Sequence, residues 1–73
     1  MPKLPVVSGA DVVRALEHLG FVVIRQRGSQ IMMRRDSSGC VVPNHRELKI
    51  ETLVGLLKQA GISPEEFIEA LNA

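Results

Sequence analysis

Arginine side chains crowd around a short segment near the middle of the sequence. Two precede and two follow Gly28-Ser29-Gln30, and these four are Arg25, Arg27, Arg34 and Arg35. Guanidinium groups bind phosphate oxygens through paired hydrogen bonds, so the cluster is suited to a nucleic-acid backbone. Solvated sheet edges also carry arginine simply because charge there prevents aggregation. The residues alone leave both interpretations open.

The positive charge is confined to one part of the chain. Nine basic and eight acidic side chains give a net charge of +1, which excludes a uniformly basic nucleic-acid binder. Residues 21–49 hold six basic and two acidic side chains, with Arg46 and Lys49 beyond the arginine cluster. Residues 50–73 hold one basic and four acidic side chains. We therefore expect a single basic surface built by the middle of the chain.

Three other side chains belong to types that can do chemistry. His45 lies in a polar loop, where an imidazole could reach a bound ligand, although isolated exposed histidines are often incidental. His18 is better explained as a favourable charge at the C-terminal end of a helix. Cys40 is the only cysteine, which excludes a disulfide framework and a multi-cysteine zinc site. We expect Cys40 to be a packed thiol, and we predict no metal and no cofactor.

Hydrophobic spacing predicts three helices. Ser8 and Asp11 form a capping pattern before apolar residues at helical spacing, and Gly20 ends this first helix. A second helix ends at Gly61 and begins without a clean cap. Ser63 caps the third, which has proline at its first position and glutamate completing the capping box.

Three β-strands are predicted between the first two helices. Their sequences are rich in β-branched and other apolar residues without helical spacing, and they cover residues 21–27, 30–35 and 40–42. Gly28-Ser29 forms the first turn. Residues 36–39 form the second, where Gly39 can adopt a positive φ, and Pro43 closes the last strand.

The order α-β-β-β-α-α predicts one α+β domain over residues 1–73. We expect a three-stranded antiparallel sheet with the helices on one face. Met32 and Met33 are adjacent on a strand and must face opposite sides of the sheet. Val22 and Ile24 add apolar side chains, so both faces look partly apolar, which hints at a docked protein partner.

Length and composition limit the functions available. A domain of 73 residues spends most of its apolar side chains on its only core, which favours polymer substrates or protein partners over a deep substrate cavity. The single cysteine and the lack of a secretion signal or membrane-spanning stretch predict a cytoplasmic protein.

The residues in these elements form a pattern that resembles the HicA (YcfA-like) toxins. The matching segments run through nearly the whole chain and are Gly20-Phe21, Arg27-Gly28-Ser29-Gln30-Ile31-Met32-Met33, Val41-Val42-Pro43-Asn44-His45, Glu47-Leu48-Lys49, Thr52-Leu53, Leu56-Leu57, Ala60-Gly61-Ile62-Ser63 and Glu66-Phe67. The resemblance implies a minimal double-stranded-RNA-binding fold and an endoribonuclease that cleaves messenger RNA. It also implies neutralisation by a HicB-type antitoxin protein encoded beside the toxin.

Position 30 departs from the family pattern. The family has Gly-Ser-His with a catalytic histidine, whereas this chain has Gly28-Ser29-Gln30. A carboxamide cannot exchange a proton near neutral pH, so the resemblance implies weak or absent cleavage. Gln30 is either a natural variant or a deliberate inactivation. We favour the second because glutamine keeps much of the size and polarity of histidine while removing its titration.

Three functions are compatible with these residues. The leading hypothesis is a ribonuclease toxin with Gln30 at the scissile phosphate. The resemblance implies that RNA is held by Arg25, Arg27, Gly28, Ser29, Arg34, Arg35, His45, Arg46 and Lys49. In this pattern His45 corresponds to a second histidine, which could bind phosphate or the antitoxin. The second hypothesis is a non-catalytic module that binds RNA or a protein through the same basic surface, and the third is a small structural protein.

Overall fold

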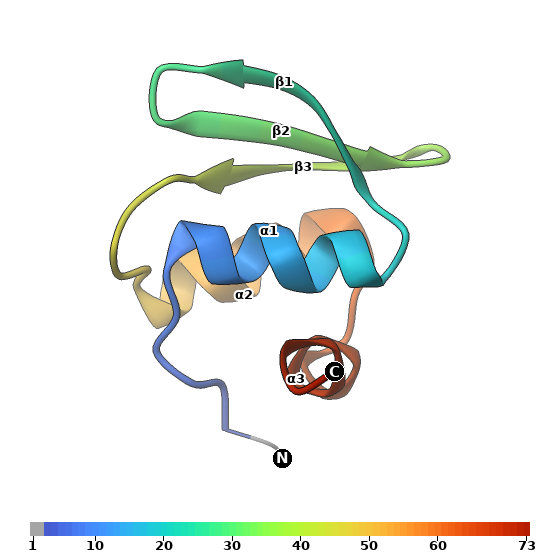
Figure 1. The fold of residues 1–73 in the computed structure, drawn as a ribbon. Coiled ribbons are helices and arrows are strands. Elements are labelled where there is room, and N and C mark those ends of the chain that lie inside the picture. The colour runs from blue at the N-terminus through green and yellow to red at the C-terminus, as the bar shows by residue number, and fades with distance from the viewer. Residues whose placement is uncertain (1–2) are drawn as a thin grey trace.

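A computed structural model describes residues 3–73 and confirms the predicted order α-β-β-β-α-α (Figure 1). The helices lie on one side of a three-stranded antiparallel sheet whose strand order is β1-β2-β3. The elements are α1 (Gly9–His18), β1 (Val22–Arg27), β2 (Gln30–Arg35), β3 (Ser38–Pro43), α2 (Ile50–Ala60) and α3 (Pro64–Leu71). Within this part of the chain, no helix is long and apolar enough to cross a bilayer.

The first helix begins and ends where the sequence predicts. The Asp11 backbone N–H donates to Ser8 Oγ, and the Ser8 N–H donates to the Asp11 carboxylate, each at 3.1 Å. Gly20 adopts a φ of 98° just after the helix, a conformation that side chains with a Cβ disfavour. The chain then passes Phe21, which is buried in the core, and enters β1 at Val22.

The turn between β2 and β3 is tighter than the sequence predicts. Asp36 and Ser37 alone form it, and β3 begins at Ser38 instead of Cys40. The prediction that Gly39 belongs to the turn is wrong, because Gly39 pairs with Arg34 in the ladder and Asp36 takes the left-handed conformation at φ 53°. Aspartate tolerates that conformation through its short polar side chain, and a two-residue turn requires it.

The two faces of the sheet differ strongly in burial. Met33 is 1% exposed and packs in the core, whereas its neighbour Met32 is 38% exposed on the opposite face. Every residue of β1 is exposed, because the helices pack mainly beneath β3 and leave β1 outermost (Figure 1). Strand β1 also contains a bulge, since Val23 pairs with Met33 and Arg25 with Met32, leaving Ile24 unpaired.

The two C-terminal helices close the core. Gly61 ends α2 with a φ of 73°, and no side chain caps the start of α2 at Lys49, as predicted. The Ser63 side chain and the Glu66 carboxylate form the capping box of α3, with both hydrogen bonds at 3.1 Å. Phe67 is fully buried, so α3 contributes one of the largest side chains of the core.

Gly9 allows the start of α1 to touch the loop that follows β3. A Cβ at Gly9 would overlap the Pro43 carbonyl oxygen and approach the Asn44 Cα to 2.8 Å. The Gly9 N–H donates to the His45 carbonyl oxygen at 2.8 Å, and the Leu48 N–H donates to the carbonyl oxygen of Val7 at 2.8 Å. The absence of a side chain at position 9 therefore fixes the loop that carries His45.

Replacing Gly9 tests this close approach. We expect Gly9→Ala to lower the free energy of unfolding by about 2 kcal/mol, because the added methyl group collides with backbone that cannot move freely. The matched control is Gly55→Ala in α2, where a Cβ meets nothing within 4 Å. That control should gain about 0.5 to 1 kcal/mol from helix propensity. Urea denaturation of both variants measures the difference, and equal effects would contradict the steric argument.

The two capping boxes predict acid sensitivity. Hydrogen bonds from the Ser8 backbone and side chain lower the pKa of Asp11 from its usual 3.8, and Ser63 lowers the pKa of Glu66 from 4.5 in the same way. The folded state therefore binds these protons less readily than the unfolded state, and stability is lost as pH falls below about 4.5.

The double variant Asp11→Asn, Glu66→Gln should lose less stability than the unaltered chain between about pH 5 and pH 3. The melting temperature followed against pH measures this loss. Glu65→Gln is the control, since Glu65 lies in the same turn of α3 and takes no part in the capping box. A control variant with the same flattened profile would show that general charge, not the capping boxes, sets the pH dependence.

Candidate functional site

Strand register collects three arginines and Gln30 on the face of the sheet that points away from the helices. Side chains of paired residues share a face, and Val22 pairs with Arg34, Arg25 with Met32, and Arg27 with Gln30. These pairs alternate with the buried Met33 and Ile31, so they occupy the opposite face, which we call the outer face. The three strands contain no aspartate or glutamate. The outer face is therefore basic without local compensation.

Arg35 lies on the other face from its neighbour Arg34. Its Nη1 donates to the Leu19 carbonyl oxygen at 2.8 Å, and its guanidinium carbon lies 4.8 Å from the centroid of the Phe21 ring. Arg35 also helps to lower the pKa of Glu66 through its charge. The sequence grouped Arg35 with the other arginines, but the structure gives it contacts that join β2 to the end of α1.

The turn between β1 and β2 is tied to the loop that carries His45. Gly28 adopts a φ of 59° in this turn, and the carbonyl oxygen of Ser29 accepts a hydrogen bond from the Asn44 N–H at 2.6 Å. Gln30, the first residue of β2, pairs with Pro43 at the end of β3. His45, the second residue after β3, therefore lies beside the end of the sheet that presents Gln30.

A hollow of about 270 Å³ lies at this end of the molecule. It is lined by Pro43, His45, Glu47, Leu48, Lys49 and Thr52. Lys49 stands immediately before α2, whose first turn has no capping side chain. Arg46 is exposed in the same loop but does not line the hollow. Of the three loop residues predicted to bind RNA, His45 and Lys49 therefore line the hollow, and Arg46 does not.

The side chains at this end differ in what chemistry they can do. Gln30 is exposed and its carboxamide can donate and accept hydrogen bonds, but it cannot take or release a proton near neutral pH. His45 carries the one imidazole near Gln30, since His18 lies in the last turn of α1. Cys40 is buried among the core residues, and burial raises the pKa of its thiol, which makes it a poor nucleophile.

No cluster of three or more potential metal ligands occurs among residues 3–73. The candidate site consists of charged and hydrogen-bonding side chains. It offers guanidinium groups along the outer face, an amide at position 30, and an imidazole with an ammonium group at the adjoining hollow. Such groups suit an extended anion better than a small neutral ligand.

Sequence reasoning missed two positions that shape this region. Gly9 carries no motif, and its role depends on a contact with residues far along the chain. The sequence predicts Gly39 in a turn, whereas in the structure Gly39 is a strand residue that puts no side chain on the outer face. Strand alternation could have indicated the position of Gly39. Arg34 faces outward, and the residue paired with it on an antiparallel strand must face outward too.

A comparison with known protein families identifies the group to which this chain is related. Residues 9–62 match the family described as the HicA toxin of bacterial toxin-antitoxin systems. The chain belongs to the HicA toxin family. The matched range includes α1, the whole sheet, α2 and every candidate residue of the site, and it ends just before the cap of α3. No curated protein and no solved structure matches this HicA-family chain.

The opposite placements of Arg34 and Arg35 can be separated by substitution. We expect Arg35→Gln to lower the free energy of unfolding by about 2 kcal/mol, because it removes a charged hydrogen bond and a cation–π contact. Arg34→Gln, the matched control on the outer face, should change stability by less than about 0.5 kcal/mol. Thermal and urea denaturation measure both, and a larger loss for Arg34 would contradict the assigned faces.

Proposed function

We propose that this HicA-family toxin is built as an endoribonuclease that acts on messenger RNA and that its activity is weakened by Gln30. The observation that carries the proposal is the strand register, which puts Arg25, Arg27, Arg34 and Gln30 on one face without a carboxylate. The family match supports a toxin, and the outer face supplies the groups that an RNA backbone requires.

RNA would lie across the outer face with its phosphates on the arginines. Arg25 and Arg27 are two residues apart on one strand, so they project to the same side about 7 Å from each other. His45 and Lys49 would hold the backbone where it leaves the sheet near the turn at Gly28-Ser29. Contacts of this kind recognise the backbone and its shape, so base preference should be weak.

Position 30 would act at the scissile phosphate. When the 2′-oxygen attacks the adjacent phosphorus, its proton must be accepted, and the departing 5′-oxygen must gain a proton. Imidazole can serve either role near neutral pH, whereas the Gln30 carboxamide can only orient the phosphate by hydrogen bonding. Loss of one such group costs about 10² to 10⁴ in rate, or roughly 3 to 5 kcal/mol of barrier.

Restoring histidine tests the proposed chemistry. We expect Gln30→His to cleave a long unstructured RNA at pH 7 about 10² to 10⁴ times faster than the unaltered chain. Gln26→His is the matched control, because Gln26 pairs with Ile31 and therefore lies on the opposite side of the same sheet. Gel analysis of the RNA measures cleavage, and circular dichroism checks that all three proteins are folded.

The outcomes distinguish the roles of the two histidine positions. Equal cleavage by the unaltered chain and Gln30→His would move catalysis away from position 30 and direct attention to His45. Equal increases in cleavage rate from Gln26→His and Gln30→His would show that any added surface imidazole suffices. That result would contradict the assignment of position 30 to the scissile phosphate.

A second candidate function is a binding module without catalysis, favoured by the amide at position 30. This module would bind RNA or a protein through the same basic surface. The ribonuclease and the RNA-binding form of the module both require RNA to contact the arginines, so salt dependence tests that shared requirement. The slope of log affinity against log salt concentration is negative, and its magnitude should decrease by about 0.7 when Arg27→Gln removes one phosphate contact. A slope unchanged by Arg27→Gln would remove Arg27 from the RNA site, and RNA binding without cleavage by Gln30→His would favour the module.

The proposed partner is a HicB-type antitoxin. A protein that placed carboxylates on the outer-face arginines and covered Gln30 would compete directly with RNA, because both ligands would use the same guanidinium groups. Neutralisation would then need no change in the shape of the toxin.

A further inference from the structure

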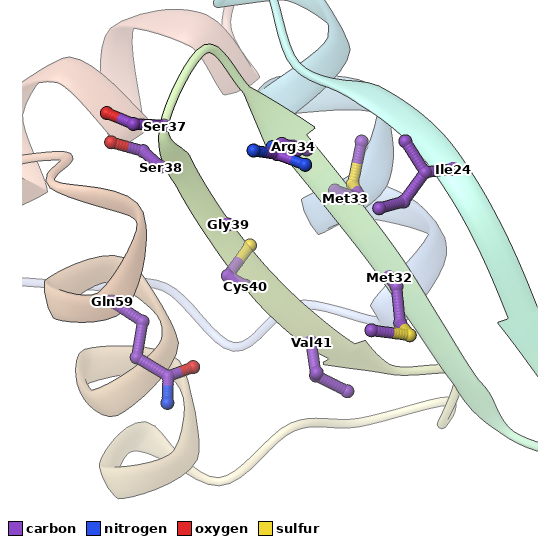
Figure 2. A pocket seen from close by; sticks show the side chains of 10 residues that line it. All are labelled: Ile24, Met32, Met33, Arg34, Ser37, Ser38, Gly39, Cys40, Val41 and Gln59. Atoms are coloured by element: carbon purple, nitrogen blue, oxygen red, sulfur yellow. The ribbon is translucent and has the colours of Figure 1, made fainter.

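A second hollow lies on the sheet, and Arg34 is the one proposed RNA contact that lines it. Its volume is about 500 Å³, and Ile24, Met32 and Val41 line it from three different strands (Figure 2). Gly39 forms part of its floor, and Arg34 and Ser37 stand at the end near the turn between β2 and β3. Met32, Arg34, Gly39 and Val41 all belong to the outer face by register. The buried Met33 and Cys40 and the α2 residue Gln59 complete the lining. The hollow is therefore a mostly apolar depression that opens on the basic face and reaches past β3 toward α2.

Large apolar side chains are exposed here, on the side of the sheet away from the core. Ile24 is 54% exposed at the β1 bulge, and Met32 is 38% exposed, while the core of the domain lies on the other side of the sheet. Val22 adds a further side chain at 58% exposure on the same strand. Large apolar side chains gathered beside a depression are typical of a surface that another protein covers.

The lining favours a protein over a nucleobase. Proteins hold unpaired bases mainly by stacking them on aromatic rings. The chain has only two aromatic residues, Phe21 and Phe67, and both are buried in the core at 2% and 0% exposure. The hollow instead presents aliphatic and thioether groups, which pack well against aliphatic side chains of varied shape.

Charge identifies the chemistry of the partner. Arg34 lies at the hollow, held by a hydrogen bond of 2.8 Å from its Nε to the Asp36 carbonyl oxygen, and Arg25 pairs beside Met32 on the same face. No acidic side chain lines the hollow. A partner segment with carboxylates next to an apolar residue would match both the arginines and the depression.

We infer that the hollow over Gly39 is the main docking point of the antitoxin, which inserts an aliphatic side chain there and places carboxylates on Arg25 and Arg34. This inference rests on the proposed function, because the partner is the antitoxin proposed above. It adds that affinity comes mainly from the apolar hollow, while the arginines set orientation and exclude RNA. The two ligands therefore respond differently to uncharged substitutions in the hollow.

The test uses the full chain, its antitoxin and two substitutions that leave the charge unchanged. Gly39→Leu fills the hollow; a Cβ there meets only the Met33 carbonyl oxygen at 3.5 Å, so the backbone accepts it. Met32→Ala removes part of the lining. Each should weaken antitoxin binding about tenfold to a hundredfold in calorimetry, and leave RNA affinity within about twofold. The control Ile50→Ala removes an exposed aliphatic side chain on α2, outside the hollow, and should change neither affinity.

A second measurement uses the unaltered protein. The methyl resonance of Met32 should shift when the antitoxin binds, and should shift more than that of Met33, which also lines the hollow but is only 1% exposed. Antitoxin affinity that survives both hollow variants, or a Met32 methyl that does not shift, would overturn the inference while leaving the antitoxin as partner. Failure of the unaltered chain to bind the antitoxin would overturn both proposals about the partner. Equal losses of RNA and antitoxin affinity would show that the hollow belongs to the RNA site.

Discussion

The close approach of backbone at Gly9 is the constraint on which the rest of this structure depends. The start of α1 contacts the backbone of Pro43 and Asn44, and the N–H of Gly9 donates a hydrogen bond to the carbonyl oxygen of His45. The same loop is bonded to the turn between β1 and β2 through Ser29. These backbone hydrogen bonds thereby hold α1, the turn between β1 and β2, and the loop that carries His45 in fixed positions relative to one another. Backbone bonds of this kind hold position regardless of which side chains the loop carries.

The sheet divides the chemistry of the chain between its two faces. Strand alternation sends Arg34 outward and Arg35 inward, although they are neighbours in sequence. The Arg35 guanidinium donates to the Leu19 carbonyl oxygen at the end of α1 and lies over the Phe21 ring. Arg34 instead faces solvent beside an apolar hollow. The helices lie beneath β3 and leave β1 outermost, so the exposed strand supplies both cationic and aliphatic groups. A domain too small for a deep cavity thus offers its ligands a surface.

The proposed RNA contacts and the proposed antitoxin contacts overlap only in part. Arg25 and Arg34 belong to both, because a phosphate and a carboxylate make similar paired hydrogen bonds with guanidinium. Gln30 and His45 lie toward the end of the sheet with the first turn, and the hollow over Gly39 lies toward the end with the second. This arrangement lets uncharged substitutions separate the two ligands, since only the protein ligand gains from burying apolar surface.

The amino-acid sequence by itself determined the order of the elements, both capping boxes, the glycine stops of α1 and α2, and the opposite faces of Met32 and Met33. These features depend on local spacing and on the two-residue period of a strand, which neighbouring residues alone decide. It did not reveal the tight turn at Asp36, because aspartate and glycine compete for a left-handed position and only the strand pairing decides between them. The tertiary structure alone decided which arginines share a face with Gln30, why position 9 must lack a side chain, and where the apolar hollow lies. Each of those depends on contacts between residues distant in sequence, which local patterns do not encode.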